Sequence, residues 1–384
     1  MSANNFQSTP NKLAPVMPKE WYHKAIALFK IPSTQYNETS MALYIIRELE
    51  LINNVKYYID DYGNIIVIKG DSKLYPCFCA HLDTVHTYPN GFKLLYQIAG
   101  ERTYLFACDN DKKSVGIGGD DKCGVFACLY LLQRLDHVKI IFFSQEKSGG
   151  TGSSNIDLTI FDDCQFLGGI DRWNGHDFIN KYFGVHTISK AFKKAVMPIL
   201  KQYGYNPNSG LFTDALNIVD RGIDLSCFNI SCGYYSHHSK NEYVDLNELY
   251  HACLLCEELS TLSERYEHPY EKVVYNNVTH WDDWDYKTDG WTKDKDGTWR
   301  QGAPKSKSIY NFPAYHTKFS NYVGSTMPKT EEEFMIDGVL VCENCGLELL
   351  AHEKKYCDTC AKWMKPADSD IPLHGETDNT DLGI

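Results

Sequence analysis

The sequence predicts an α/β fold in which a mostly parallel sheet has helices on both faces. Between residues 19 and 268, short strand-like apolar runs alternate with helical patterns, and this alternation is typical of such a sheet. The 384 residues are 43% hydrophobic, enough for a sizeable core. The formal net charge of −12 argues against a nucleic-acid partner for the chain as a whole.

The elements follow from the hydrophobic period, taken in chain order. Apolar spacing of helical type is found in segments 21–31, 40–52, 121–135, 191–204, 213–219 and 246–266. Strand-like runs are found in segments 55–59, 65–70, 74–83, 138–144, 166–171 and 224–231. The apolar runs are too short to cross a bilayer and the polar N-terminus lacks a signal-peptide core, so no membrane partner and a cytoplasmic location are expected.

Changes in composition predict the domain boundaries. We expect a flexible tail at 1–18, the α/β domain at 19–268, a Trp-rich linker or small β-ribbon at 269–336, a four-cysteine module at 337–363 and an acidic tail at 364–384.

The fourteen cysteines divide into two groups. Cys342, Cys345, Cys357 and Cys360 form C-x2-C-x11-C-x2-C, which resembles a zinc ribbon with one closed, structural zinc site. The charges around this module are balanced, so a fold-stabilising role or docking of a protein partner is favoured over DNA binding. The other cysteines lie in apolar stretches, where a buried thiol behaves as a small hydrophobic side chain.

Polar residues at strand ends carry the chemistry. His81 and Asp83 lie two residues apart at the end of the run 74–83, so both are expected on one side. Taken alone, this pair is better explained by an ordinary strand-end turn. Asp120 precedes a helix, where a carboxylate can bridge cations or cap the helix. Glu146 and Asp171 follow two further strands. Ligands bind where the carboxyl ends of parallel strands meet, so these residues are expected to converge.

Six motifs in a fixed order connect these residues: DDYGNIIVIKG, AHLDTV, GGDDKCG, FFSQEKSGGTGS, GGID and HSKNEYV. With them, residues 21 to 260 resemble the co-catalytic zinc exopeptidases, the superfamily of peptidase T, aminopeptidases and carboxypeptidases. The resemblance implies that His81 and Asp171 bind a first zinc, that Asp83 orients His81, and that Asp120 bridges two metals. It also implies that Glu146 is the general base and that His238 binds a second zinc.

Two departures from the family pattern stand out. The family has two consecutive glutamates after this strand, whereas here Lys147 follows Glu146. A charged lysine has no lone pair for a metal, so a second zinc would lose one of its usual ligands. The predicted number of zinc ions in the site is therefore one or two. The stretch between Asp171 and His238 is also too short for the dimerisation domain that peptidase T-like enzymes insert there.

The predicted function is that of a zinc metallohydrolase, an exopeptidase that cleaves peptide bonds near a chain end, with aminopeptidase ahead of carboxypeptidase. Its substrate would be a peptide or small amide. Two alternatives stay open: an amide deacylase of the same superfamily, and a non-catalytic metal-binding scaffold in which Lys147 marks lost turnover.

Overall fold

The computed structural model describes residues 14–89, 92–182, 185–210 and 213–268, and the backbone of four short strands between 291 and 340. The chain divides into two compact units, Met1–Pro18 with Leu28–Met327, and Lys19–Ala27 with Pro328–Ile384. Helix α1 (Lys19–Phe29) begins in the second unit, which also contains an antiparallel pair, β17 (Met335–Ile336) and β18 (Val339–Leu340).

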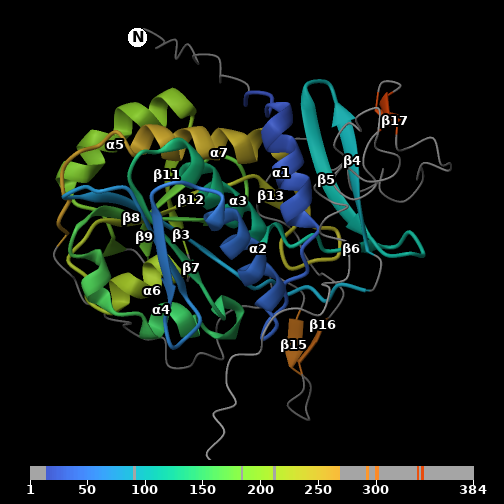
Figure 1. The fold of residues 1–384 in the computed structure, drawn as a ribbon, viewed down its shortest axis with the longest axis horizontal. Helices are drawn as coiled ribbons and strands as arrows, with labels where there is room; N and C mark the ends of the chain where they lie inside the picture. The colour runs from blue at the N-terminus through green and yellow to red at the C-terminus, as the bar shows by residue number, and fades with distance from the viewer. Residues whose placement is uncertain are drawn as a thin grey trace, which may run out of the picture. The chain divides into compact units, whose positions relative to one another are not determined.

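The first unit contains the elements that form the site (Figure 1). Its helices are α2 (Thr39–Glu50), α3 (Gly119–Arg134), α4 (Thr151–Asn155), α5 (Lys190–Tyr203), α6 (Asp214–Asp220) and α7 (Leu246–Leu259), with the 3-10 helices η1 (Glu146–Ser148) and η2 (Leu158–Phe161). Its main strands are β1 (Val55–Ile59), β2 (Ile65–Lys69), β3 (Tyr75–His81), β7 (Val138–Phe143), β8 (Cys164–Arg172), β9 (Asp177–Tyr182), β10 (Val185–His186), β11 (Asn206–Gly210) and β12 (Cys227–Ser231).

These strands form one nine-stranded sheet in the order β1-β2-β7-β3-β8-β12-β9-β10, with β11 paired to β9. Its centre, β7-β3-β8-β12, is parallel, as the sequence predicts. The flanking pairs β1-β2, β2-β7 and β12-β9 are antiparallel. The carboxyl ends of the central strands therefore meet at one edge, which is the edge that positions the site.

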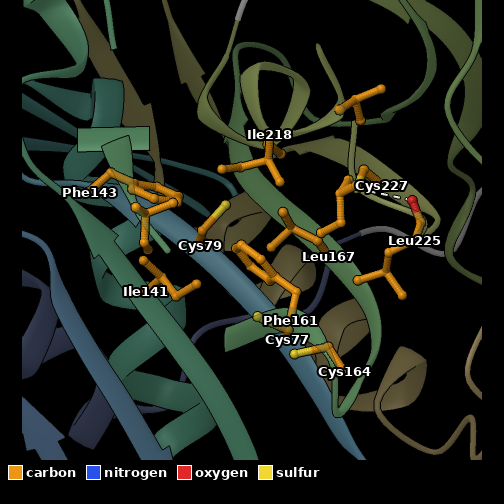
Figure 2. Packing of buried hydrophobic residues seen from close by; sticks show 14 of the residues in the cluster. Cys77, Cys79, Ile141, Phe143, Phe161, Cys164, Leu167, Ile218, Leu225 and Cys227 are labelled. Atoms are coloured by element: carbon orange, nitrogen blue, oxygen red, sulfur yellow. Dashed lines mark hydrogen bonds between the residues drawn. The ribbon is translucent and has the colours of Figure 1, made fainter. Parts of the chain in front are cut away.

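The two faces of the sheet bury different sets of side chains. On one face, Phe78 packs edge-on against Phe166 with ring centroids 5.5 Å apart, and Phe166 contacts Phe192 of α5. On the other face, Cys77 and Cys79 belong to a buried cluster with residues of α6 (Figure 2). Side chains alternate along a strand, so helices are needed on both faces of a strand as apolar as β3.

The predicted role of the cysteines in the α/β domain is confirmed. All ten described cysteines are buried and free. Burial raises the pKa of the Cys227 thiol, with a smaller contribution from neighbouring Cys164. These thiols therefore pack as small apolar groups.

A second sheet was not predicted from the sequence. It contains β4 (Lys93–Ala99), β5 (Arg102–Cys108), β13 (Tyr234–Tyr235) and β14 (Tyr243–Asp245) in the order β13-β14-β5-β4, and β6 (Ser114–Val115) pairs with β5. Much of β4 is exposed, so its sequence lacks the continuous apolar run that identifies β3 and β7. The last helix also ends earlier than predicted, at Leu259.

The elements between Asp171 and His238 include β9, β10, β11 and β12, all of which belong to the central sheet. In the described part of this stretch there is accordingly no inserted domain. None of the described helices is long and apolar enough to span a membrane.

Several predictions fall on residues outside the described ones. These include the zinc ribbon with Cys342, Cys345, Cys357 and Cys360, the acidic tail and most of the Trp-rich segment. Within that segment, β15 (Trp291–Lys293) pairs antiparallel with β16 (Trp299–Gln301). The domain boundaries stay predictions.

Candidate metal centre

His81 ends β3 with a side chain that is fully buried, and the whole residue is 1% exposed. Its backbone N–H donates to Asp121 Oδ2 over 3.1 Å, and its Nε2 lies 2.9 Å from Asp120 Oδ1. On the far side of the ring, Nδ1 lies 3.4 Å from Asp83 Oδ1. The imidazole therefore lies between two carboxylates, an arrangement that fixes the orientation of a ligating histidine.

Asp120 and Asp121 have different roles at the start of α3. Both have non-helical backbone angles. Asp121 Oδ1 accepts the N–H of Gly124 over 2.8 Å, which caps the helix in the manner of an N-terminal aspartate. The carboxylate of Asp120 instead contacts His81 and His238. The capping alternative for this motif therefore applies to Asp121, and the binding of a cation by Asp120 stays a prediction.

Asp171 lies near the end of β8, and its main chain is held on both sides by one amide. Its N–H donates to Asn229 Oδ1 over 2.9 Å, and Asn229 Nδ2 donates to its carbonyl over 2.7 Å. The Tyr234 hydroxyl donates to Asp171 Oδ1 over 3.1 Å, so Oδ2 is left facing His81, 3.8 Å from Nε2. Burial and the negative charge of Asp120 raise the pKa of Asp171 to about 7.

His81, Asp120 and Asp171 form a set of donors suited to a metal ion. One donor atom from each lies within 4.8 Å of the other two, and this is the only such group of three or more among the described residues. One imidazole nitrogen and two carboxylate oxygens are ligands that zinc accepts, and three protein ligands leave a coordination position open. The residues present therefore fit one zinc ion.

Glu146 begins η1, three residues after the end of β7, and Asp83 fixes its backbone. Asp83 Oδ1 accepts the N–H of Glu146 over 3.0 Å, and Oδ2 accepts that of Lys147 over 2.9 Å. Burial alone would raise the pKa of Asp83, but the nearby imidazole of His81 and the N–H and charge of Lys147 lower it. The carboxylate of Glu146 approaches the donor set, with Oε2 at 3.7 Å from His81 Nε2.

A second metal does not fit in the same way. His238, in a left-handed backbone conformation with φ 57°, places Nε2 2.8 Å from Asp120 Oδ2. Lys147 lies beside the same carboxylate, with Nζ 2.7 Å from Asp120 Oδ1 and 2.9 Å from Oδ2. An ammonium offers no lone pair, so the described residues supply only two donors there.

Sequence reasoning missed several groups that hold the site in place. Glu38 Oε1 accepts the N–H of Gln145 over 2.8 Å, and Glu242 accepts that of Gly118 over 2.6 Å. Tyr234 and Asn229 fix Asp171 as described above. Glu242 lies within the quoted motif HSKNEYV and could have been found there. Glu38 lies in a polar stretch more than a hundred residues before its partner and has no local signal.

Comparison with known proteins adds to this geometry. No family model and no curated protein matches the sequence. Among solved structures, aminopeptidase PepT from Bacillus cereus is similar with a TM-score of 0.54 and 14% identity, over 64% of this chain and 99% of that chain. A tripeptidase from Staphylococcus aureus has a TM-score of 0.49 and 12% identity, over 65% of this chain and 100% of that one. A TET aminopeptidase from a marine-sediment thaumarchaeon has a TM-score of 0.49 and 12% identity, over 64% and 98%.

The likeness to aminopeptidase PepT shows that the chain has the same fold. The predicted α/β architecture is thereby confirmed, together with the mostly parallel centre of its sheet.

Proposed function

We propose that this chain is a zinc-dependent exopeptidase that hydrolyses peptide bonds near a chain end, with an aminopeptidase preference. One observation carries the proposal: His81, Asp120 and Asp171, from three separate elements, place donor atoms within 4.8 Å of one another beside the carboxylate of Glu146. Grouping a metal-type donor set with a further carboxylate suits hydrolysis of an amide.

His81, Asp120 and Asp171 would hold the zinc ion. When bound, zinc supplies Lewis acidity, which lowers the pKa of water and polarises a carbonyl group. The Asp83 carboxylate holds the imidazole of His81 in its orientation through the contact at Nδ1.

Glu146 would act as the general base. Its carboxylate accepts a proton from the attacking water and returns it to the leaving amine, which requires only hydrogen-bond reach to both. The backbone N–H groups of Glu146 and Lys147 both donate to Asp83, which holds this segment beside the donor set. The carboxylate of Glu146 therefore approaches the donor set from a fixed position. Asp83 is accordingly a positioning residue.

The fold shared with aminopeptidase PepT supports a peptidase over a deacylase, and an aminopeptidase over a carboxypeptidase. A scaffold that only binds metal would not need the carboxylate of Glu146 beside the donor set. The position of Glu146 therefore supports catalysis over binding alone.

Glu146→Gln tests the proposal because the amide keeps the shape of the side chain but cannot take up the proton. We expect kcat for unblocked short peptides to fall about 100-fold or more while zinc content stays at the parent level. Glu101→Gln, at an exposed turn, is the matched control and should behave as the parent. Peptides blocked at the amine end should be poor substrates. Undiminished hydrolysis in Glu146→Gln would contradict the role of Glu146.

A further inference from the structure

Lys147 points its side chain into the centre of the site. Its Nζ lies 2.7 and 2.9 Å from the two carboxylate oxygens of Asp120 and 2.9 Å from Glu146 Oε2. The side chain is 10% exposed. An ammonium has three N–H donors, and here three carboxylate oxygens lie within reach of them. Lys147 therefore has no donor left over for a substrate, and its contribution is charge and position.

The main chain of Lys147 is fixed as firmly as its side chain. Its N–H donates to Asp83 Oδ2 over 2.9 Å, and its carbonyl accepts from Gln35 Nε2 over 3.0 Å. Gln145, two residues earlier, has φ 54° and donates its N–H to Glu38. These contacts aim the side chain at Asp120 rather than at solvent.

The charges around Lys147 favour the ammonium form. Its Nζ lies at ion-pair distance from two carboxylates, 2.7 Å from Asp120 Oδ1 and 2.9 Å from Glu146 Oε2. On the opposite side of Asp120, His238 Nε2 is hydrogen-bonded to Oδ2 over 2.8 Å. A divalent ion between Asp120 and His238 would lie within a few ångströms of this ammonium, and the two cations would repel each other.

From this geometry we infer that the hydrolase site binds a single metal ion and that the Lys147 ammonium takes the place of a second one. The inference rests on the proposed function, because it assumes a first metal at His81, Asp120 and Asp171. Asp120 then bridges a metal and an ammonium instead of two metals. His238 acts as a hydrogen-bond partner of Asp120 and not as a ligand.

Zinc content of the full-length protein tests the inference. The parent and Lys147→Glu are stripped of metal, saturated with zinc, freed of excess ion and counted by mass spectrometry. We expect Lys147→Glu to bind one zinc per chain more than the parent, because its carboxylate completes a donor set with Asp120 and His238. Zinc held elsewhere in the chain contributes equally to both and cancels. Equal zinc content in the two folded proteins would overturn the inference.

Two control variants isolate the cause. Lys147→Arg keeps a cation and should match the parent. Lys113→Glu makes the same change of charge at a lysine whose side chain is 76% exposed, and it should also match the parent. An extra zinc in Lys113→Glu would show that net charge, rather than the position of Lys147, governs binding, and would overturn the inference.

Two variants of the parent make the test independent of whether Lys147→Glu folds. His238→Ala should leave the zinc content of the parent unchanged, and loss of one zinc would overturn the single-metal inference. Asp171→Asn should lose one zinc. If Asp171→Asn retains all its zinc, the proposed first site fails, and this failure is read separately from the result for His238→Ala.

Discussion

The two oxygens of Asp120 face two different surroundings. Towards the β3 and β8 ends, Oδ1 lies 2.9 Å from His81 Nε2, and Asp171 completes a group of metal-type donors. Towards the loop after β13, Oδ2 lies 2.8 Å from His238 Nε2, and the ammonium of Lys147 lies 2.9 Å from Oδ2 and 2.7 Å from Oδ1. Asp120 thus belongs to two groups. With His81 and Asp171 it makes three metal-type donors, and with His238 it makes two donors beside a cation.

A metal site depends on every lone pair around one point. Asp120 has an imidazole beside each of its oxygens, His81 at one and His238 at the other, yet a single lysine changes what can bind beside His238. The ammonium of Lys147 neutralises part of the negative charge of Asp120 and Glu146 by ion pairing, without coordination and without a bound ion.

His81→Ala should have the largest effect, because it removes a donor from the first side. We expect the loss of one zinc per chain and a fall in kcat/KM for short peptides of about 1000-fold or more, since a metal ion supplies several kcal/mol of transition-state stabilisation. His186→Ala, at an exposed position on β10, is the control. Zinc content and steady-state kinetics are the measurements. Parent-like zinc content in His81→Ala would contradict the role of His81 as a metal ligand.

Asp83→Asn should have an intermediate effect, because Asp83 supports both sides. Each of its oxygens accepts a different N–H, from Glu146 and from Lys147, and an amide group has only one acceptor oxygen. We expect zinc affinity or kcat/KM to fall about 10- to 100-fold, the usual range for a residue that orients a ligand. A titration with a zinc indicator checks the first quantity. A change below twofold in both would show that Asp83 does not position the site.

Glu38→Gln should have the smallest effect and should appear in stability. Burial and the negative charge of Asp83 raise the pKa of Glu38 from its ordinary value of 4.5 to about 7. Between pH 4.5 and about pH 7, the folded chain keeps a proton on Glu38 that the unfolded chain has lost. The free energy of unfolding therefore falls as the pH rises through this interval. The amide oxygen of glutamine can still accept the N–H of Gln145.

The measurement is the midpoint of thermal unfolding between pH 4 and pH 8. The advantage of Glu38→Gln over the parent should be near zero below about pH 4.5, grow through the interval and level off above about pH 7. A constant difference at all pH values would show that the carboxyl group of Glu38 titrates normally.

The sequence predicts the central sheet well because its strands are continuous apolar runs. β3 and β7 are buried at every position, and a run of that kind is visible without any tertiary information. The hairpin of β4 and β5 was missed because exposed residues interrupt its pattern. The non-helical backbone of Asp120 and Asp121 at the start of α3 was also missed, because the motif GGDDKCG indicates only that a helix begins nearby.

For the candidate site, the order of residues is enough to predict which side chains lie at the strand ends. His81, Glu146 and Asp171 end or follow buried runs, and parallel strands bring such ends to one edge. The sequence also shows that a lysine follows Glu146. The direction of that side chain is visible only in the folded chain. The direction depends on the hydrogen bond that the Lys147 N–H donates to Asp83, on the one that its carbonyl accepts from Gln35, and on the carboxylate of Asp120. All three partners are distant along the chain. A side chain with several rotatable bonds takes its direction from such contacts, and local sequence does not encode them.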